Sequence, residues 1–389
     1  MDLRTFDFAE NGHIPLNGEW ELYMTSLIPA KKFNAGQQIA VDYVSFPSTW
    51  DENSKAMKPG KGFATYHLKL LLKPQRFSLE LPHMYSAYVL WINGEPIAKN
   101  GVVGMSDETS KPQWLPQTVD FTATSDTLDL VIHVSNFTHA KGGIREPLLL
   151  GLPANLHFKR TIAVNSNIVL SCSLLLLALL FVFVYMFVKQ EVASLYFAAL
   201  ASTWAVRSLF SNLYIITAYY PDFPWELCIK IEYISLYFTM IWAVFFLSSL
   251  FPHDENKLFR YLFIACNIIF ILFTLFFDAW LYTQFLPVYL SFCLLLLLYG
   301  IYVLLHAVIY ERQGVWLIVS SVMLAVIIFS YDLSAYQGIS SFNPIIINLG
   351  YIGMFFLMAT CLAFQFGFLK RSTNRDMLTY DDLYGGAKK

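Results

Sequence analysis

The chain has 389 residues, of which 56% are hydrophobic, 17% are aromatic and only 14% are charged. A mean hydropathy of +0.50 is too high for a soluble protein, so at least part of the chain is embedded in a membrane. The formal net charge of −2 excludes a nucleic-acid-binding protein, because that function requires a basic surface. The large hydrophobic fraction also excludes an intrinsically disordered chain.

The charged residues divide the sequence into two parts. Residues 1–157 contain 13 Lys or Arg and 16 Asp or Glu, as a solvated domain does, whereas the remainder contains 13 and 12, mostly in short loops. We therefore predict a multi-domain membrane protein. It comprises an extracytoplasmic β-domain over residues 1–153, a transmembrane helical bundle over 158–370 and a truncated cytoplasmic tail over 371–389.

The first part contains short runs of alternating apolar and polar residues bounded by Gly, Pro, Asn and Asp, a pattern typical of an antiparallel β-sandwich. The predicted strands are Trp20–Tyr23, Thr65–Leu72, Phe77–Leu81, Tyr88–Ile92 and Leu128–Val134. Asn93-Gly94, between two apolar runs, predicts a β-hairpin. Glu19 and Glu21 lie two apart on one strand, and we expect them on a solvated face, because glycosidase carboxylates flank a cleft built from different elements.

A helix needs about 20 apolar residues to cross the hydrocarbon core of a bilayer. Seven such runs follow the β-domain: Ile162–Val188, Ala193–Leu213, Trp225–Phe251, Phe259–Phe277, Thr283–Tyr310, Val315–Leu333 and Pro344–Leu369. They predict a seven-transmembrane α-helical bundle. Six or eight spans remain alternatives, because the fourth run is the shortest and the second contains Arg207.

Loop charge predicts the orientation, because Lys and Arg accumulate on the cytoplasmic side. Three alternate loops, Ala218–Pro224, Asp278–Tyr282 and Ser334–Asn343, contain no Lys or Arg. The basic residues of the other segments are Lys189, Lys257, Arg260, Arg312, Lys370, Arg371 and Arg375. Although Lys159 and Arg160 oppose this pattern, we predict that the β-domain is outside and the C-terminus is in the cytoplasm.

Proline gives a second signal for the same orientation. Pro224, Pro287 and Pro344 each stand near the start of a span predicted to run inward. Proline suits the first turn of a helix, where its missing N–H would have no intrahelical partner. Asn343 directly before Pro344 is a predicted N-cap.

The N-terminus and the cysteines bear on processing. The first residues are polar, so we expect that a native signal peptide was removed and Met1 added. All five cysteines lie in predicted spans, which predicts a β-domain without disulfides. His83, His133 and His139 lack the spacing of metal ligands, and we predict neither a metal nor a cofactor.

Six side chains of the β-domain are candidates for a ligand site. Sugars bind to aromatic faces and planar polar groups, and a sandwich brings loop residues together at one edge. The candidates are Trp50, His83, Tyr85, Trp114, His139 and Arg145. Core packing is the alternative for Trp50, Trp114 and Arg145, and it is the expected role of Trp20 and Trp91.

Four charged residues lie within predicted spans, where a charge costs about 2.5–3.5 kcal/mol on insertion scales. They are Arg207, Lys230, Glu232 and Asp332, and the predicted topology places all four in the outer half of the bundle. We favour an ion pair between Arg207 and Glu232, since opposite charges at similar depth offset the cost of desolvation. This polar layer either fixes helix register or changes partners during signalling.

Several short motifs resemble known families. Leu16-Asn17-Gly18-Glu19-Trp20, Pro47-Ser48-Thr49-Trp50, Ala64-Thr65-Tyr66 and Ser86-Ala87-Tyr88-Val89-Leu90-Trp91-Ile92-Asn93-Gly94 resemble the jelly-roll sugar-binding domain of glycoside hydrolase family 2. Val134-Ser135-Asn136-Phe137, Gly142-Gly143-Ile144, Lys230-Ile231-Glu232-Tyr233 and Leu250-Phe251-Pro252 are similar to bacterial seven-transmembrane receptors with diverse intracellular signalling modules. Asp376-Met377-Leu378-Thr379 resembles the start of a diguanylate cyclase domain, but the residues that follow depart from that pattern.

These resemblances cover nearly the whole chain and imply a receptor of the bacterial inner membrane with a periplasmic jelly roll. We expect it to sense a small ligand, carbohydrate included, or an envelope partner. The signal would pass through the lipid-embedded helices to a cytoplasmic signalling protein or a fused output domain. The chain itself is expected to be no enzyme and to bind no nucleic acid. A membrane-anchored adhesion or assembly module is the first alternative and a transporter the second, and a homodimer is left open.

The polar layer generates a prediction. Arg207→Ala should abolish either folding or the response, because it removes the partner of a charge within the membrane. Thermal melting and a signalling assay of the variant test this expectation. Normal melting together with a normal response would remove the Arg207 pair from the signalling route.

Overall fold

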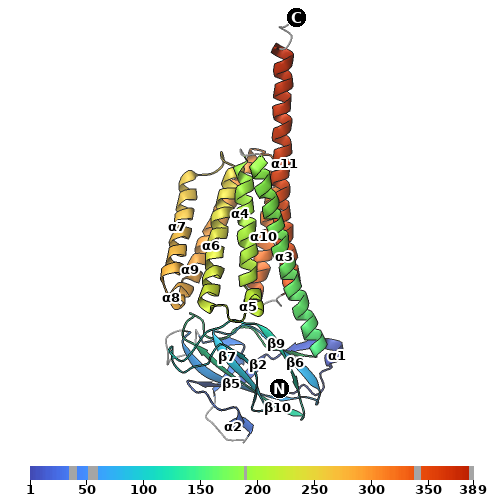
Figure 1. Ribbon diagram of the computed structural model, residues 1–389, viewed down its shortest axis with the longest axis vertical. Helices are drawn as coiled ribbons and strands as arrows, with labels where there is room; N and C mark the ends of the chain where they lie inside the picture. Colours follow the sequence, from blue (N-terminus) through green and yellow to red (C-terminus); the bar gives the residue numbers. More distant parts are fainter. Residues whose placement is uncertain (35–41, 51–59, 188–190, 337–342, 385–389) are drawn as a thin grey trace. The chain divides into compact units, whose positions relative to one another are not determined.

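The computed structural model describes residues 1–34, 42–50, 60–187, 191–336 and 343–384 (Figure 1). The chain divides into two compact units. The first unit comprises Met1–Asn165, Leu209–Ile234 and Ile271–Val288, and the second comprises Ser166–Ser208, Ser235–Phe270 and Tyr289–Lys389. The β-sandwich and several short helical segments therefore belong to the same unit.

The first unit contains the strands of the sandwich. Their bounds are β1 (His13–Pro15), β2 (Gly18–Met24), β3 (Asp42–Phe46), β4 (Ser48–Thr49), β5 (Gly62–Leu71), β6 (Arg76–Leu81), β7 (Ala87–Ile92), β8 (Glu95–Asn100), β9 (Gln117–Thr122), β10 (Thr127–Asn136), β11 (Gly143–Ile144) and β12 (Leu149–Gly151). One sheet has the strand order β3-β2-β5-β10-β7-β8 and the other β1-β12-β6-β9, while β11 pairs with β4. The predicted β-sandwich is confirmed.

Alternating side chains build the core between the two sheets. On β7, Tyr88, Leu90 and Ile92 are buried in it, as the period of two in a strand requires. Trp20 is fully buried, stacks on Phe46 with ring centroids 3.9 Å apart, and donates its indole N–H to the Leu16 carbonyl. Trp91 alternates with the core residues of β7 and is only half-buried. The expectation that Trp91 is a core residue is therefore wrong.

The predicted hairpin joins β7 to β8. Asn93 and Gly94 both have positive φ angles, 50° and 85°, as a two-residue turn between twisted strands requires. The Asn93 side chain also accepts a hydrogen bond of 2.8 Å from the backbone N–H of Asp129 on β10. The turn is thus fastened to the middle of the six-stranded sheet.

Within the described residues, seven helices are long and apolar enough to cross a membrane, as predicted. The helices in chain order are α1 (Phe8–Asn11), α2 (Lys31–Asn34), α3 (Pro153–Phe187), α4 (Val192–Phe210), α5 (Ile215–Tyr219), α6 (Trp225–Leu250), α7 (Lys257–Phe276), α8 (Ala279–Gln284), α9 (Leu286–Ile309), α10 (Val315–Tyr336) and α11 (Pro344–Tyr384). The candidate spans lie in α3, α4, α6, α7, α9, α10 and α11. Together with the sandwich they confirm the predicted fold class.

Two spans begin elsewhere than predicted. Helix α3 begins at Pro153 rather than Ile162, because the polar turn before the span binds the β-domain. Lys159 there contacts Glu80 at 2.9 Å, and Arg160 donates to the Pro116 carbonyl. The fifth span begins at Leu286 rather than Thr283, because Thr283 and Gln284 end the short helix α8, and Pro287 stands in the first turn of α9.

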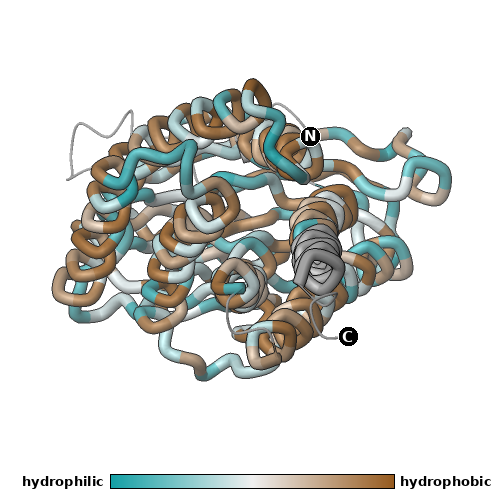
Figure 2. Tube along the Cα trace, turned by 90° about the horizontal axis from the view of Figure 1, so that it is seen from above, coloured by the Kyte–Doolittle hydropathy of each residue, from teal (hydrophilic) through white to brown (hydrophobic). Residues whose placement is uncertain are grey.

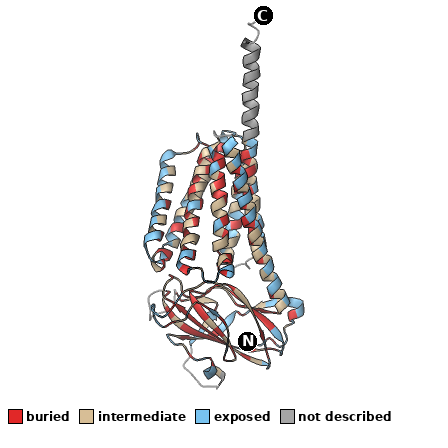
Figure 3. Ribbon diagram, in the orientation of Figure 1, coloured by how far each residue is buried: buried red, intermediate tan, exposed pale blue. Residues whose placement is uncertain are grey.

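The second unit packs its helices around an apolar core. Large side chains of this core include Phe197, Phe246 and Phe355. Apolar residues continue around the helices, as the hydropathy colours of Figure 2 show. Many of them are exposed (Figure 3), and on α7 they include Leu262 and Ile269. Exposed apolar side chains on long helices are the surface that lipid tails cover.

The cap of α11 is also as predicted. Asn343 accepts hydrogen bonds from the backbone N–H groups of Ile345 at 3.1 Å and Ile346 at 3.4 Å. Helix α11 then continues well past its apolar part, which ends at Gln365, and extends to Tyr384.

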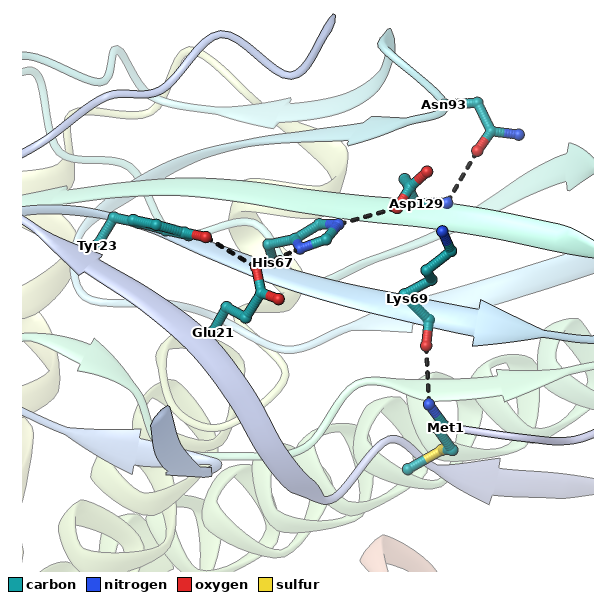
Figure 4. A network of polar contacts seen from close by, with 7 residues as sticks. All are labelled: Met1, Glu21, Tyr23, His67, Lys69, Asn93 and Asp129. Carbon is teal, nitrogen blue, oxygen red and sulfur yellow. Dashed lines mark hydrogen bonds and ion pairs between the residues drawn. The ribbon is translucent and has the colours of Figure 1, made fainter. Parts of the chain in front are cut away.

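A polar network crosses the outer face of the six-stranded sheet (Figure 4). The imidazole of His67 lies between two carboxylates, with Nδ1 2.7 Å from Glu21 and Nε2 2.9 Å from Asp129. Phe33 stacks on the same ring at 4.2 Å, and Tyr23 donates its hydroxyl to Glu21. Glu21 is therefore a bonded member of this network rather than a simply solvated residue, although it lies on the outer face as predicted.

The network makes the stability of the β-domain depend on pH. Burial lowers the pKa of His67, but hydrogen bonds and charge from Asp129 and Glu21 outweigh that effect and raise it above 6.5. The stabilisation by His67 is therefore complete below about pH 6.5 and is lost as the pH rises through the raised pKa. We expect His67→Gln to destabilise the domain by about 1–3 kcal/mol at low pH and by less at high pH. Melting followed by near-ultraviolet circular dichroism measures the difference.

His157→Gln is the matched control. His157 also bonds to a carboxylate, Asp120 at 2.8 Å, but its side chain is half exposed. Water screens such a pair, so the control should change stability little at any pH. A destabilisation by His67→Gln that stayed constant from about pH 5 to 9 would show that His67 carries no additional proton in the folded state.

Candidate functional site

Four of the six predicted ligand residues form one aromatic cluster at an edge of the sandwich. His83 and Tyr85 follow β6, Trp114 lies between β8 and β9, and His139 lies between β10 and β11. Tyr85 stacks on His139 with ring centroids 4.6 Å apart. Trp114 lies 5.3 Å from His83 and 5.6 Å from His139. The structure thus brings these loop residues together at one edge.

Two aromatic residues from the helical segments of the same unit complete the cluster. Tyr214, which precedes α5, lies 5.2 Å from His83 and 5.0 Å from Trp114. Trp225, the first residue of α6, contacts Trp114 edge-on at 5.5 Å. We refer to His83, Tyr85, Trp114, His139, Tyr214 and Trp225 as the aromatic cluster. Its last two members had no distinguishing signal in the sequence beyond their place at the ends of spans.

Hydrogen bonds join the same loops to the helical segments. Gln113 donates its side-chain amide to the Pro221 carbonyl at 2.5 Å, between α5 and α6. The backbone N–H of Ala140 donates to the Thr283 hydroxyl at 3.0 Å, on α8. Residues directly beside Trp114 and His139 are therefore bonded to helical segments in two places.

The cluster is closed to solvent. Trp114 is 3% exposed, Tyr85 and His139 are 5% exposed, and His83 is 8% exposed. A sugar needs an open aromatic face, and these rings already pack against one another. In this conformation the cluster is a packed joint between β-domain loops and helix ends, and its role in ligand binding stays a prediction.

The remaining two candidates flank the cluster. Trp50 is 4% exposed and donates its indole N–H to the Tyr66 hydroxyl at 2.7 Å. Arg145 bonds to Glu146 at 3.0 Å, and its charge acts on His83 and His139. Trp50 therefore belongs to the core, the alternative foreseen for it, whereas Arg145 supplies positive charge beside the cluster.

Burial keeps both histidines of the cluster neutral. It lowers the pKa of His83 to about 3, and the charge of Arg145 acts in the same direction. Burial likewise lowers the pKa of His139 to about 3. Neither ring carries a charge near neutral pH, so the cluster is held together by packing of uncharged rings.

Local backbone structure places His139 and Trp50. Asn136 is fully buried and donates its amide to the carbonyls of Gly60, His139 and Lys141, which ties the loop after β10 into position. A Cβ on Gly142 would lie 2.5 Å from the Trp50 ring, so only glycine allows this close approach. Asn136 therefore organises the backbone at this edge of the sandwich.

The four charged residues predicted within the spans are not all brought together by the contacts of the described residues. In the first unit, Lys230 pairs with Glu226 at 2.7 Å, and Glu232 accepts a 3.3 Å hydrogen bond from Tyr214 of the aromatic cluster. Arg207 and Asp332 belong to the second unit. The pair between Arg207 and Glu232 stays a prediction.

An ionic cluster that no sequence pattern indicated joins the loop after α6 to α9 and to the loop after α9. Asp254, between α6 and α7, has a 1% exposed side chain and binds Arg312 at 2.9 Å and His306 at 2.8 Å. Burial favours the protonated carboxyl, but the hydrogen bonds from Arg312 and His306 outweigh it and lower the pKa of Asp254. Asp254 thus ties the loop after α6 to α9 and the loop after α9. A single loop aspartate gave no signal of this role.

Metal binding finds no support in the described part of the chain, where no group of His, Cys, Asp and Glu side chains is placed to hold an ion. The free cysteines of that part, such as Cys228 and Cys361, lie in helices.

Solved structures similar to part of this chain include three bacterial β-glucuronidases. The enzyme of Faecalibacterium prausnitzii is 17% identical with a TM-score of 0.28, that of an uncultured Clostridium is 18% identical with 0.27, and that of Ruminococcus gnavus is 14% identical with 0.29. Each match covers 36% of this chain and 31%, 28% and 29% of the respective enzyme. The chain thus spans less than a third of their length. A comparison with curated proteins finds no match.

A family model described as 7TM diverse intracellular signalling matches residues 166–370, which is more than half of the chain. The family is one of signalling domains rather than enzymes, and the matched region contains the apolar helices from α4 to α10 with most of α3 and the apolar part of α11. The chain is therefore a multi-pass membrane protein. It belongs to the family of seven-transmembrane proteins with diverse intracellular signalling.

Proposed function

We propose that this protein is a receptor of a bacterial inner membrane whose β-domain senses a small ligand or an envelope partner on the periplasmic side. The observation that carries this proposal is the aromatic cluster, in which His83 and Trp114, from two β-domain loops, pack against Tyr214 and Trp225. A sensor must couple its binding domain to its spans, and this cluster supplies that coupling through buried contacts.

The cluster is suited to changing its arrangement. The indole N–H groups of Trp114 and Trp225 are both buried and meet no acceptor among the described residues. A buried donor without an acceptor costs about 1–3 kcal/mol, so an arrangement that gives these groups acceptors gains free energy. That amount is comparable to the coupling of 1–3 kcal/mol that typical allosteric ligands provide.

The route of the signal follows from the contacts. A ligand that binds one arrangement of the loops more tightly shifts the population toward that arrangement. The shift moves Trp114 and Gln113 relative to α5 and the start of α6, and Ala140 relative to α8. Glu232 of α6 receives the change through its hydrogen bond with Tyr214.

The orientation is part of the proposal. Lys159 and Arg160 oppose the distribution of positive charge, but in the folded chain they bind Glu80 and the Pro116 carbonyl. Their positive charges therefore serve the β-domain, and the remaining loops obey the rule for cytoplasmic Lys and Arg. We place the β-domain in the periplasm and the end of α11 in the cytoplasm. There a signalling protein or a fused output domain, such as a diguanylate cyclase, receives the signal.

The orientation predicts labelling from one side only. Asp107→Cys in the β-domain and Asp222→Cys between α5 and α6 should react with a membrane-impermeant maleimide in spheroplasts. Lys257→Cys at the start of α7 should react only after the membrane is opened. All three side chains are exposed, so access from each side decides the result. Labelling of Lys257→Cys in sealed spheroplasts would contradict the orientation and the sensing role drawn from it.

The proposed coupling predicts what happens when the Trp114 side chain is removed from the aromatic cluster. Trp114→Ala leaves a cavity that costs about 3–5 kcal/mol where it is not refilled. We expect the amide hydrogens of α5 and of the first turns of α6 to exchange about tenfold faster or more, because their packing partner is lost. Hydrogen–deuterium exchange of the full chain in nanodiscs, resolved by peptide, measures this effect.

Trp91→Ala is the matched control, since Trp91 lies on the outer face of the sheet, away from the cluster. It should leave the exchange of α5 and α6 unchanged. A rigid anchoring module would respond differently, because Trp114→Ala would then speed exchange only in the β-domain loops. That result would favour the adhesion alternative over the receptor.

A further inference from the structure

The outer face of the six-stranded sheet contains a cavity that the aromatic cluster does not share. Its volume is about 370 Å³. The lining residues are Leu27, Val89, Trp91, Lys99, Gly101, Val102, Val103 and His133. This volume is within the range of small-molecule sites, near its lower end.

Three neighbouring strands form the floor of the cavity. His133 on β10, Val89 on β7 and Lys99 on β8 are paired in register and lie in one row across the sheet. Trp91, two residues along β7 on the same face, packs against His133 with ring centroids 4.2 Å apart. The half-buried Trp91 thus presents an aromatic surface on the outer face of the sheet, which takes no part in the core.

Hydrogen bonds fix the wall that contains Leu27. The Ile28 backbone N–H donates to the Thr65 hydroxyl at 3.0 Å, and that hydroxyl donates to the Ser26 carbonyl at 2.7 Å. His133 donates through Nε2 to the Ile28 carbonyl at 2.7 Å. The segment that carries Leu27 is therefore held on the sheet without a ligand.

The opposite wall is equally fixed. Val102 and Lys111 exchange two backbone hydrogen bonds of 2.9 Å, which closes the loop after β8. Gly101 has a φ of +68°, and a Cβ there would lie 2.3 Å from the Lys111 carbonyl, so the loop requires glycine at this point. With both walls fastened, little conformational entropy is lost when a ligand enters.

The lining chemistry selects the class of ligand. Aliphatic side chains and an indole provide most of the surface, whereas a sugar would need several polar partners for its hydroxyl rim. Lys99 supplies the positive charge, since burial lowers the pKa of His133 and leaves that ring neutral. Because Nε2 of His133 donates to Ile28, its Nδ1 is an acceptor.

We propose that this cavity binds a small aromatic carboxylate, with the ring against Trp91, the carboxylate at Lys99 and a ring N–H or O–H donor at His133. The proposal deepens the proposed function and rests on it only in making the β-domain the sensing part. It moves the ligand site from the aromatic cluster, whose rings are packed, to the outer face of the sheet.

Indole-3-acetate and indole-3-acetamide test the proposal, because they differ in charge and share the indole ring. Binding is measured by equilibrium dialysis against the full chain in phosphatidylcholine nanodiscs, with empty nanodiscs subtracted. We expect the acid to bind with a Kd of about 1 mM or tighter, on the basis of typical affinity per atom. The amide should bind about three- to tenfold more weakly, and this preference should fall with added salt.

Two variants assign the contacts. Lys99→Gln, at an exposed position, should abolish the preference for the acid while leaving binding of the amide unchanged. Trp91→Ala should weaken both compounds about tenfold. Lys111→Gln is the matched control, since Lys111 joins the same loop through its backbone and is outside the cavity lining, and it should alter neither affinity.

The outcomes separate this site from the proposed function. Absence of acid binding, or a preference for the acid that survives Lys99→Gln, would overturn the proposed site. This holds even if Trp114→Ala still speeds amide hydrogen exchange in α5 and α6. Acid binding with the expected response to Lys99→Gln supports the site, even if the exchange of α5 and α6 shows that the receptor function is wrong.

Discussion

The constraint on which the structure depends is the absence of water around the long apolar helices of the described chain. Side chains such as Leu262 and Ile269 of α7 are exposed in the folded chain, a state that only lipid stabilises. Helical backbone satisfies its own polar groups there, so irregular segments are confined to the ends of the spans. The short helices α5 and α8 and the loop after α6 occupy such ends. The contacts of Tyr214, Thr283 and Asp254 lie there.

Three histidines of the β-domain show how local surroundings determine whether an imidazole is charged or neutral. His67 lies between two carboxylates, which outweigh burial and favour its charged form. His83 and His139 are enclosed by aromatic rings, and burial keeps them neutral. One sheet face is therefore held together by charge and one edge by aromatic packing. The two regions respond to acid in opposite directions, since protonation favours the first and disfavours the second.

Much of the fold could be predicted from the sequence, because hydrophobic periodicity and turn residues act locally. The predicted strands, which correspond to β2, β5, β6, β7 and β10, have such local signals, and so do the Asn93-Gly94 turn and the predicted spans. The strands β3, β8 and β9 were not among the predicted strands. The short strands β4 and β11 and the helix α5 lacked local signals, since they depend on partners distant in sequence. Among the candidate site residues, convergence at one edge followed from sandwich topology. The packing of Tyr214 and Trp225 against His83 and Trp114 did not, because these residues are distant in sequence. The roles of Asp254 and Trp91 likewise depend on distant neighbours.

Helix α11 has a mechanical consequence for whatever acts on its far end. Its 41 residues, at about 1.5 Å each, give a rod about twice as long as a bilayer core is thick. A continuous hydrogen-bonded helix resists bending but transmits twist, so turning the membrane part about its axis turns the protruding part by the same angle. Such a rod transmits rotation and sliding. A small rotation among the packed spans therefore changes which side of the protruding part of α11 faces a given direction.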